Sequence, residues 1–552
     1  MAESKIKNSV IIALLGIAVF ICFSRTWENS FLKWDDTKYI LENPSTKGFS
    51  STNIKTILTT PYQGNYIPVT FLAFNIERSA FGDSPKVFIT INILLHFANC
   101  ILVFFLVILL SRNKITAFLC ALLFAIHPLH VESVAWMAEQ KDVLYAFFFF
   151  LSLICYIKYA NSKKWKWYVF SLLLMLLSAG SKTMGIVLPG IFIAYDFFIG
   201  RKWFQPKILL EKIPFLLVGI VFVWAEMHAV RNHAENLHSF NLSLIERATV
   251  ACYAVIRYVF LLIAPVHLSA YYPYPMSPGD PFPVWIWFFV PLLLGITFLI
   301  YYFRKNKSLV FSSLFFILNL SLVLQIFPVG DSMMADRFVY VASVGFFLLT
   351  AVFLQKLFQH KKFKTILITT TGVYFLFLGT TTFLRCEIWK NDETLWSDVI
   401  SKYDHVPLAF INHGNILFEK GNTNDAISDY TKAIGCGYDT KDAFFNRGIV
   451  YMKKKDFQKA ESDFTEVLKL NPKDPDALYD RVVSYINLDK RKEALTDLDL
   501  YISINPNNAD VFGKRGVMRF TTGDTTGACQ DWKKALSLGS SAAKDALELY
   551  CK

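Results

Sequence analysis

Two adjacent carboxylates, Asp35 and Asp36, follow closely on the first apolar segment of the chain, residues 8–24. A carboxylate beside the hydrocarbon boundary loses part of its hydration, and a second carboxylate next to it raises the pKa of one partner. A carboxylate with a raised pKa suits a general base that takes the proton from a hydroxyl group. The pair is therefore a candidate catalytic site, and a solvated turn without a catalytic role is the alternative.

A second group of polar residues lies between two later apolar segments. It contains two histidines, three carboxylates and a lysine, namely His127, His130, Glu132, Glu139, Lys141 and Asp142. Two histidines three residues apart suggest a metal, but the H-E-x-x-H pattern of zinc enzymes needs Glu directly after the first His. We therefore predict no metal and no cofactor, and expect these side chains to line the mouth of a cavity.

Two cations are candidates for binding a phosphate group. Arg337 belongs to a third polar group, with Asp331, Asp336 and Tyr340, directly before an apolar segment. The planar fork of an arginine side chain matches phosphate oxygens. Lys182 is the second candidate, and Tyr340 is expected to line the same cavity. The alternative for each cation is a side chain that extends to the membrane interface without binding a ligand.

Apolar helices must position these residues. The chain has 552 residues, of which 54% are hydrophobic and only 18% charged, whereas soluble domains carry about 25% charged residues. This composition excludes a soluble enzyme, a DNA-binding protein and a disordered chain for the N-terminal two thirds. Apolar segments long enough to cross a membrane lie near residues 8–24, 87–110, 115–127, 142–159, 165–180, 183–199, 213–230, 282–303, 308–327, 338–357 and 364–384.

The distribution of basic residues predicts the orientation of these spans. Short basic clusters such as 201–212 and 304–307 should be cytoplasmic by the positive-inside rule. The first segment resembles a signal peptide without a cleavage site, so we expect an uncleaved anchor with a cytoplasmic N-terminus. Residues 245–264 contain three charges and should not cross. About eleven crossings then place the C-terminal tail outside; a crossing by 245–264 would make it cytoplasmic.

The tail repeats with a period of 34 residues. Alanines recur at Ala426, Ala460, Ala494 and Ala528, and large apolar residues recur at Tyr430, Phe464, Leu498 and Trp532. This pattern is typical of tetratricopeptide (TPR) repeats, which stack helix pairs into a solenoid that binds peptides or proteins. The nine scattered cysteines indicate neither a zinc site nor a disulfide framework.

The order of these motifs resembles a known family. Trp34-Asp35-Asp36, the 127–142 block, Ser181-Lys182, residues 336–340 and residues 385–396 before TPR repeats occur in one sequence. That order is similar to the transmembrane-and-TPR-containing O-mannosyltransferase-like proteins and their bacterial relatives in the GT-C glycosyltransferase superfamily. The resemblance implies a polyprenyl-phosphate sugar donor and a catalytic carboxylate pair at Asp35 and Asp36. One departure is Thr183, where the family commonly has Glu.

Together these observations predict an all-α protein, a polytopic GT-C-like membrane helical bundle followed by a TPR α-solenoid. The expected parts are a glycosyltransferase-like domain 1–384, a linker 385–406 and a TPR domain 407–552. The resemblance implies transfer of a mannose-like sugar to a hydroxyl of a protein or glycan acceptor outside a bacterial cytoplasmic membrane. The expected partners are a polyprenyl-phosphate sugar, a protein or peptide acceptor bound by the TPR repeats, and membrane lipids, with no nucleic acid. A non-catalytic membrane scaffold and, third, a transporter are the alternatives.

Overall fold

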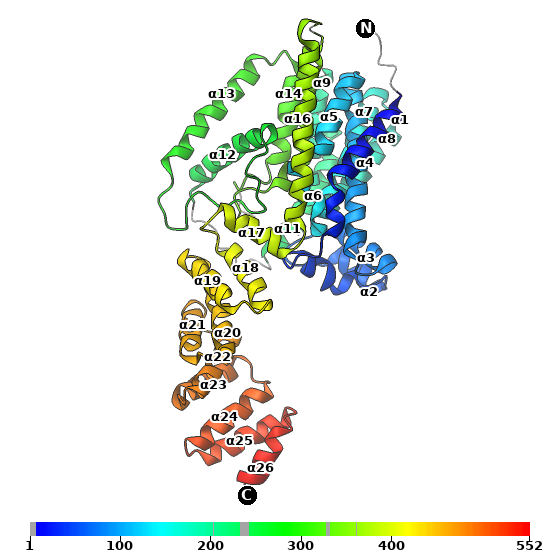
Figure 1. Cartoon of the computed structure of the whole chain (residues 1–552). Helices are drawn as coiled ribbons and strands as arrows, with labels where there is room; N and C mark the ends of the chain where they lie inside the picture. Colours follow the sequence, from blue (N-terminus) through cyan, green and yellow to red (C-terminus); the bar gives the residue numbers. More distant parts are fainter. Residues whose placement is uncertain (1–6, 203, 232–241, 327–331, 360, 552) are drawn as a thin grey trace. The chain divides into compact units, whose positions relative to one another are not determined.

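The computed structural model describes residues 7–202, 204–231, 242–326, 332–359 and 361–551, and Figure 1 shows it as a ribbon. These residues are predominantly helical. The described part contains no β-strand, only two isolated bridges, Tyr62–Asn65 and Tyr272–Met334. The chain divides into two units, Met1–Lys402 and Tyr403–Lys552, which are described separately below. The predicted all-α class is confirmed.

The N-terminal unit is built around long apolar helices. Five helices of the described residues are long and apolar enough to cross a membrane: Pro85–Ser111, Met137–Ser162, Pro206–Arg231, Val284–Tyr302 and Lys364–Trp389. A sixth candidate is the pair Lys114–Ile126 and Pro128–Ala135, bent by 56°, and four shorter apolar helices accompany them. The unit is therefore an integral membrane protein, while the count of about eleven crossings stays a prediction.

The bundle consists of the helices of these spans and of further helices packed beside them. Their bounds are α1 (Asn8–Cys22), α4 (Pro85–Ser111), α5 (Lys114–Ile126), α6 (Val131–Ala135), α7 (Gln140–Ser162), α8 (Trp165–Ser181), α9 (Leu188–Ile199), α11 (Ile213–Arg231), α12 (Leu244–Ile263), α13 (Phe289–Tyr302), α14 (Lys307–Leu320), α15 (Ser343–Leu357) and α16 (Lys364–Arg385). Short connections join many of them, as is common in helical bundles.

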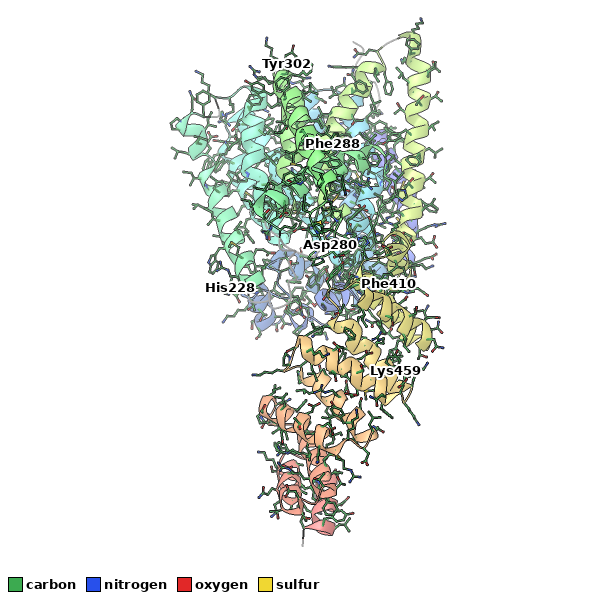
Figure 2. The ribbon with its side chains drawn as sticks, turned by 90° about the vertical axis from the view of Figure 1, so that its left-hand side faces the viewer. His228, Asp280, Phe288, Tyr302, Phe410 and Lys459 are labelled. Atoms are coloured by element: carbon green, nitrogen blue, oxygen red, sulfur yellow. A yellow bond between two sulfur atoms is a disulfide. The ribbon has the colours of Figure 1, made fainter. Side chains whose placement is uncertain are left out.

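Helix α13 shows the kind of surface this unit presents. Figure 2 labels Phe288 and Tyr302 at its two ends, and both side chains are exposed. Leu294 and Phe298 between them are each 65% exposed. Water would oppose such a continuous apolar surface, whereas lipid chains solvate it and leave the backbone hydrogen bonds inside the helix.

Helix α12, which covers the segment expected not to cross, differs from the spans. It begins at a capping box in which Ser243 and Glu246 each accept a hydrogen bond from the other's backbone N–H. Glu246, Arg247 and Arg257 lie along its 20 residues, and its charges keep it outside the set of candidate spans. Whether α12 crosses the membrane stays a prediction.

The loop between α1 and α4, residues 23–84, is folded. It contains the 3-10 helix Ser24–Glu28, the π-helix Thr37–Leu41, the 3-10 helix Pro44–Thr46 and the helices α2 (Ser51–Thr59) and α3 (Pro68–Phe81). Arg78 of α3 donates to the carbonyl of Ile40 and to Thr46 Oγ1, the latter at 2.7 Å. Asn75 donates to the carbonyl of Ser45 at 3.0 Å. These hydrogen bonds fix the position of the loop that contains Asp35.

Residues 385–402, expected to be part of a linker, are helical and belong to the N-terminal unit. They form the 3-10 helix Cys386–Trp389 and helix α17 (Asp392–Lys402). The indole ring of Trp389 stacks on that of Trp136, with centroids 5.3 Å apart, and Trp396 packs against Trp34 at 5.0 Å. These buried aromatic contacts hold the segment in the bundle, because aromatic rings contribute a large buried apolar area.

The C-terminal unit is a series of antiparallel helix pairs. Its helices are α18 (Pro407–Glu419), α19 (Thr423–Gly435), α20 (Lys441–Lys453), α21 (Phe457–Leu470), α22 (Pro475–Asn487), α23 (Arg491–Ile504), α24 (Ala509–Thr521), α25 (Thr525–Ser537) and α26 (Ala542–Tyr550). Helices α18–α25 form four helix pairs, as the period of 34 residues predicts, and the short helix α26 follows them. A disulfide joins Cys529 of α25 to Cys551 after α26, which corrects the expectation that the cysteines form no such bond; their spacing alone gave no signal.

Glycine in the first helix of a repeat makes room for an aromatic ring from the second. A Cβ atom on Gly448 would come within 2.8 Å of the Phe464 ring, and one on Gly516 within 2.6 Å of ring carbon Cδ1 of Trp532. The third repeat has Val482 at the glycine position and the smaller Leu498 opposite it. Small and large residues therefore change together where the two helices cross.

A ladder of arginine–aspartate pairs repeats with the same period. Arg481 donates from Nε and Nη2 to the two carboxylate oxygens of Asp497 at 2.7 and 2.8 Å. Its Nη1 donates to Thr465 Oγ1 of the preceding repeat at 3.1 Å. The equivalent pairs are Arg447–Asp463 and Arg515–Asp531, and the first repeat has His413–Asp429 instead. Each arginine therefore joins its own helix pair to the repeat before it.

Replacing Arg481 with alanine should destabilise the repeats around it by about 3 kcal/mol, because the buried Asp497 carboxylate loses its cation. Hydrogen exchange of α22 and α23 in the full chain measures the effect. Arg491→Ala is the control, since its pair with Asp489 is exposed and should contribute less than about 1 kcal/mol. Equal protection losses for both variants would contradict a structural role for the ladder.

Candidate active site

Asp36 is a structural tether. Its side chain is fully buried, and its two carboxylate oxygens accept hydrogen bonds from the backbone N–H of Leu32 at 2.8 Å and of Ala138 at 2.7 Å. Burial raises the pKa of Asp36, and these two N–H groups oppose the shift. The tether fastens the loop between α1 and α4 to the segment between α6 and α7. Both oxygens are therefore occupied by the protein itself.

Asp35 has a different environment. Its side chain is half-buried, and its carboxylate accepts no hydrogen bond from the residues that the structure describes. Burial raises the pKa of Asp35. The cation of Lys141 lowers it, and that of Arg337 lowers it by a smaller amount. An accessible carboxylate with a raised pKa is what a general base requires. The adjacent pair thus divides into one held and one available carboxylate.

A cluster of ion pairs lies beside Asp35. Glu132, Glu139 and Asp142 are its carboxylates, with side chains at most 1% exposed. Its cations are Arg337, Lys182 and Lys141, whose side chains are 18%, 15% and 11% exposed. The predicted residues from three separate sequence groups therefore meet. Because the anions are deeper than the cations, the accessible side of the cluster is positive.

Arg337 connects two of the buried carboxylates. Its Nη1 pairs with Glu132, its Nε lies 3.4 Å from Glu139 Oε1, and its backbone N–H donates to Glu132 Oε2 at 3.1 Å. These carboxylates raise the pKa of Arg337, so the guanidinium stays charged. Its Nη2 makes no hydrogen bond with the described residues. That nitrogen can donate to an oxyanion bound from outside.

The two lysines hold the other side of the cluster. Lys182 pairs with Asp142 and lies 3.6 Å from Glu139 Oε2, while Lys141 Nζ lies 3.0 Å from Glu139 Oε1. Ser133 donates to Asp142 at 2.9 Å. A removed cation would leave a buried carboxylate without compensation, which costs several kcal/mol. Lys182 and Lys141 are therefore required for the fold as well as available to a ligand.

The two histidines lie in the core and not at an accessible surface. His127 Nε2 donates to the carbonyl of Leu262 at 3.2 Å, and His130 Nδ1 donates to that of Phe124 at 2.7 Å. His130 Nε2 contacts Ser343 Oγ at 3.1 Å. Both rings are fully buried and hydrogen-bonded to the protein, so the structure does not place them where they were expected, at a cavity mouth. Among the described residues no group of three His, Cys, Asp or Glu side chains could hold a metal.

Tyr340 and Asp336 also support the site from within. The Tyr340 hydroxyl contacts His96 Nδ1 at 2.7 Å and accepts from Asn99 at 3.2 Å. Asp336 accepts from the Tyr272 hydroxyl at 2.6 Å and faces the guanidinium of Arg385. Both side chains are buried, and both fix the segment that carries Arg337. Asp331, named with them from the sequence, lies outside the described residues.

Two residues of the site escaped the sequence analysis. Glu226 of α11 accepts a hydrogen bond from the backbone N–H of Tyr66 at 3.0 Å and lies near Thr183, Lys141 and Lys182. Tyr39 packs its ring under the Lys141 ammonium, 5.1 Å from the centroid. A lone acid inside an apolar span was the available signal for Glu226. The structure thus brings a carboxylate beside Thr183, where the resembled family has an acid in the sequence.

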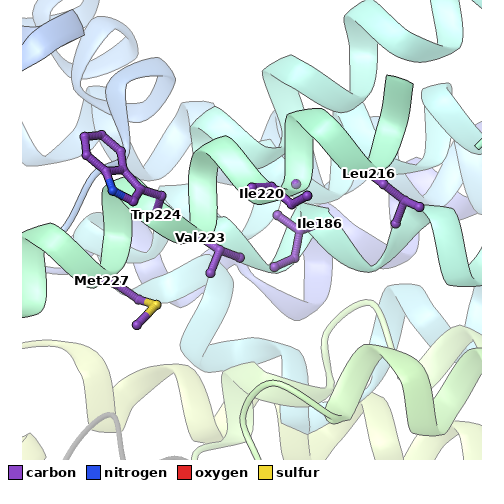
Figure 3. A pocket seen from close by; sticks show the side chains of 7 residues that line it. Ile186, Leu216, Ile220, Val223, Trp224 and Met227 are labelled. Carbon is purple, nitrogen blue, oxygen red and sulfur yellow. The ribbon is translucent and has the colours of Figure 1, made fainter. Parts of the chain in front are cut away.

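An apolar groove runs along α11 next to the site. Figure 3 shows its lining side chains, and its volume is about 370 Å³. The lining residues are Ile186, Leu216, Gly219, Ile220, Val223, Trp224 and Met227. Ile186 follows Lys182 by four residues, and Val223 and Met227 flank Glu226 along the helix. The groove therefore ends close to the charged cluster.

Asp36→Asn should destabilise the N-terminal unit by about 2 kcal/mol, because the amide N–H₂ group would face one of the two buried backbone N–H donors. Asp35→Asn should leave stability nearly unchanged, since its carboxylate makes no hydrogen bond to the described residues. Thermal unfolding of the two purified variants in detergent makes the comparison. A larger loss of stability for Asp35→Asn would reverse the assigned roles.

Comparison with known proteins finds similarity to TPR repeats in the C-terminal unit. Two tetratricopeptide-repeat family models match residues 408–435 and 442–474. The solved TPR structure of MamA is 21% identical, and the alignment covers 27% of this chain and 88% of that one with a TM-score of 0.26. YrrB, described as a TPR protein with an unusual peptide-binding site, is 20% identical over 36% of this chain and 98% of its own, with a TM-score of 0.27.

Longer similarities extend into the membrane unit. The chain is 25% identical over 519 residues to the Homo sapiens protein named protein O-mannosyl-transferase TMTC2, which covers 76% of this chain and 61% of that protein. It is 26% identical over 457 residues to the Caenorhabditis elegans protein O-mannosyl-transferase F38B6.6, covering 78% and 62%. The chain thus spans about six tenths of the length of these curated relatives. It is an integral membrane protein with C-terminal TPR repeats that is similar to proteins named protein O-mannosyl-transferases.

Proposed function

We propose that this protein is a membrane glycosyltransferase of the GT-C type, which transfers mannose or a similar sugar from a polyprenyl phosphate to a hydroxyl group of a protein or glycan. The names of its relatives support the transfer reaction. The single observation that carries the proposal is the position of Asp35, a half-buried carboxylate within electrostatic reach of the cations Lys141 and Arg337. A base beside an oxyanion site is the arrangement that hydroxyl attack on a sugar phosphate needs.

The reaction is a single displacement. Asp35 takes the proton of the acceptor hydroxyl while its oxygen forms a bond to the anomeric carbon of the sugar. The bond between that carbon and the phosphate oxygen breaks, and the polyprenyl phosphate leaves with the electron pair. Arg337 stabilises the new negative charge through Nη2, with Lys182 and Lys141 as the neighbouring cations. Because the cations are held by buried carboxylates, they need no reorganisation during the reaction.

The TPR unit would recruit the acceptor. TPR solenoids bind peptides and proteins on their inner surface, and a tethered acceptor has a high effective concentration at a site on the same chain. We propose that the substrate is therefore an extended protein segment. Binding to the TPR repeats and transfer at Asp35 are separable functions, because the two lie in different units.

We propose that the TPR unit lies outside the cytoplasm. The disulfide between Cys529 and Cys551 supports this orientation, because disulfides persist in oxidising compartments and are rare in the cytosol. The basic clusters between the apolar helices support it independently. A bacterial cytoplasmic membrane stays a prediction of the family resemblance.

A reporter that is active only in the periplasm, fused after Lys552, should be active in cells that carry the full chain. The same fusion to a reporter that works only in the cytoplasm is the control and should be inactive. The opposite pattern would mean that α12 crosses the membrane, which would place the TPR unit on the cytoplasmic side.

Asp35→Asn should lower transfer from a polyprenyl-phosphate sugar by at least about 10²-fold, the effect typical of losing a general base. Below the raised pKa of Asp35 the wild-type rate should fall as the base is protonated, and the variant should lack that limb of the pH profile. The purified protein is assayed with a panel of polyprenyl-phosphate sugars, and Glu42→Gln in the same loop is the control. If a double Asp35→Asn, Asp36→Asn variant restored full function in cells, the protein would be a scaffold.

A further inference from the structure

Glu226 is a half-buried carboxylate that has no role in the displacement mechanism. It is the only acidic residue of the apolar helix α11. A carboxylate within a membrane span is costly unless it has partners or a ligand. Its carboxylate accepts hydrogen bonds from the Tyr66 backbone and from the Thr183 hydroxyl, and the side chain is half-buried. A carboxylate has about four lone-pair sites, so Glu226 can still accept further hydrogen bonds.

Its neighbours place it near Asp35. The Tyr39 hydroxyl lies within electrostatic reach of Asp35, Lys141 and Glu226, and Lys141 affects both carboxylates. Glu132, Glu139 and Asp142 are buried beneath the cations. Asp35 and Glu226 are therefore two half-buried carboxylates near the cations of the cluster.

Glu226 lies beside the apolar groove of α11. Val223 and Met227, one turn before and one residue after it, line the apolar groove of α11 (Figure 3). Thr183 and Lys182, next to Glu226, begin the segment that leads to Ile186 of the same groove. A lipid-linked group whose phosphate meets the cations would therefore present its sugar between Glu226 and Asp35.

We propose that Glu226 binds hydroxyl groups of the donor sugar and so determines which sugar the protein accepts. This inference rests on the proposed function, because it assumes a polyprenyl-phosphate sugar. Glu226 accepts hydrogen bonds from sugar hydroxyls, Lys182 and Arg337 bind the phosphate, and Asp35 remains available to the acceptor. No bond is made or broken at Glu226.

The rival role is structural, a latch that holds Tyr66 and the first loop against α11. Glutamine separates the two roles, because its amide oxygen can still accept the Tyr66 N–H while its charge is lost. A hydrogen bond to a charged group is stronger than one to a neutral group by an amount that changes binding about tenfold. Glu226→Gln therefore keeps the latch and weakens the sugar contact.

The experiment compares two lipids in binding to the full-length protein in detergent, polyprenyl-phosphate mannose and polyprenyl phosphate without a sugar. Glu226→Gln should weaken binding of the sugar-bearing lipid about tenfold and leave binding of the sugar-free lipid unchanged. Glu28→Gln makes the same chemical change at an exposed residue paired with Lys390, and should change neither. Unchanged binding of polyprenyl phosphate also shows that the variant is folded.

Mannose donors that lack one hydroxyl identify the contact. When the missing hydroxyl is the one that Glu226 binds, neither protein can make the contact. Wild type and Glu226→Gln should then bind that deoxy donor equally well. Equal weakening of both lipids by Glu226→Gln would show a latch only, and no weakening of either would show that Glu226 contacts no sugar; both results overturn the inference. If wild type binds neither lipid, the proposed donor is wrong and the inference falls with it.

Discussion

The compensation of three buried carboxylates by three cations is the constraint on which the site depends. Glu132, Glu139 and Asp142 lie where an isolated ionised carboxylate would be strongly destabilising. Arg337, Lys182 and Lys141 make their burial tolerable, and Arg337 and Lys182 reach the cluster from segments that are distant in sequence. The helices must therefore pack so that these residues meet. The same requirement leaves the cations on the outside of the cluster, where an anion can approach them.

The loop between α1 and α4 depends on that cluster through backbone contacts. Asp36 binds the N–H of Ala138, within the segment that also carries Glu139, and Asn29 donates to the carbonyl of Ala135 at 3.1 Å. Trp34 stacks on Trp136 at 4.8 Å, and the Arg337 guanidinium lies 5.5 Å from the centroid of that indole. The contacts of its neighbours thus fix the backbone of Asp35 at the edge of the positive surface, while its own carboxylate makes no hydrogen bond with the described residues. A general base needs a fixed position and a carboxylate that is free to accept a proton, and Asp35 has both.

The two units use charge in different ways. In the TPR unit, each arginine–aspartate pair repeats with the fold and joins one repeat to the next, so its role is structural. In the membrane unit the ion pairs do not repeat, and the cations of the cluster are partly accessible. Sequence similarity to proteins named O-mannosyl-transferases extends through both. Recruitment of an acceptor by one unit and transfer by the other would combine them in a single protein.

The sequence by itself determined the fold class and the site segments, since both depend on local patterns. Runs of apolar residues define membrane helices, and a period of 34 residues with small residues at fixed positions defines TPR repeats. Residues of unusual chemistry between apolar segments were enough to select Asp35, Arg337 and Lys182 as candidates.

Only the tertiary structure decided which residue of each group does what. Asp35 and Asp36 are equivalent in sequence, but only Asp36 accepts a hydrogen bond from the backbone N–H of Ala138. The burial of His127 and His130 depends on Leu262 and Ser343, and no local pattern contains that information. Glu226 joins the site because α11 packs near Lys182. Desolvation and hydrogen bonding are set by neighbours distant in the chain, and therefore only the folded structure assigns these roles.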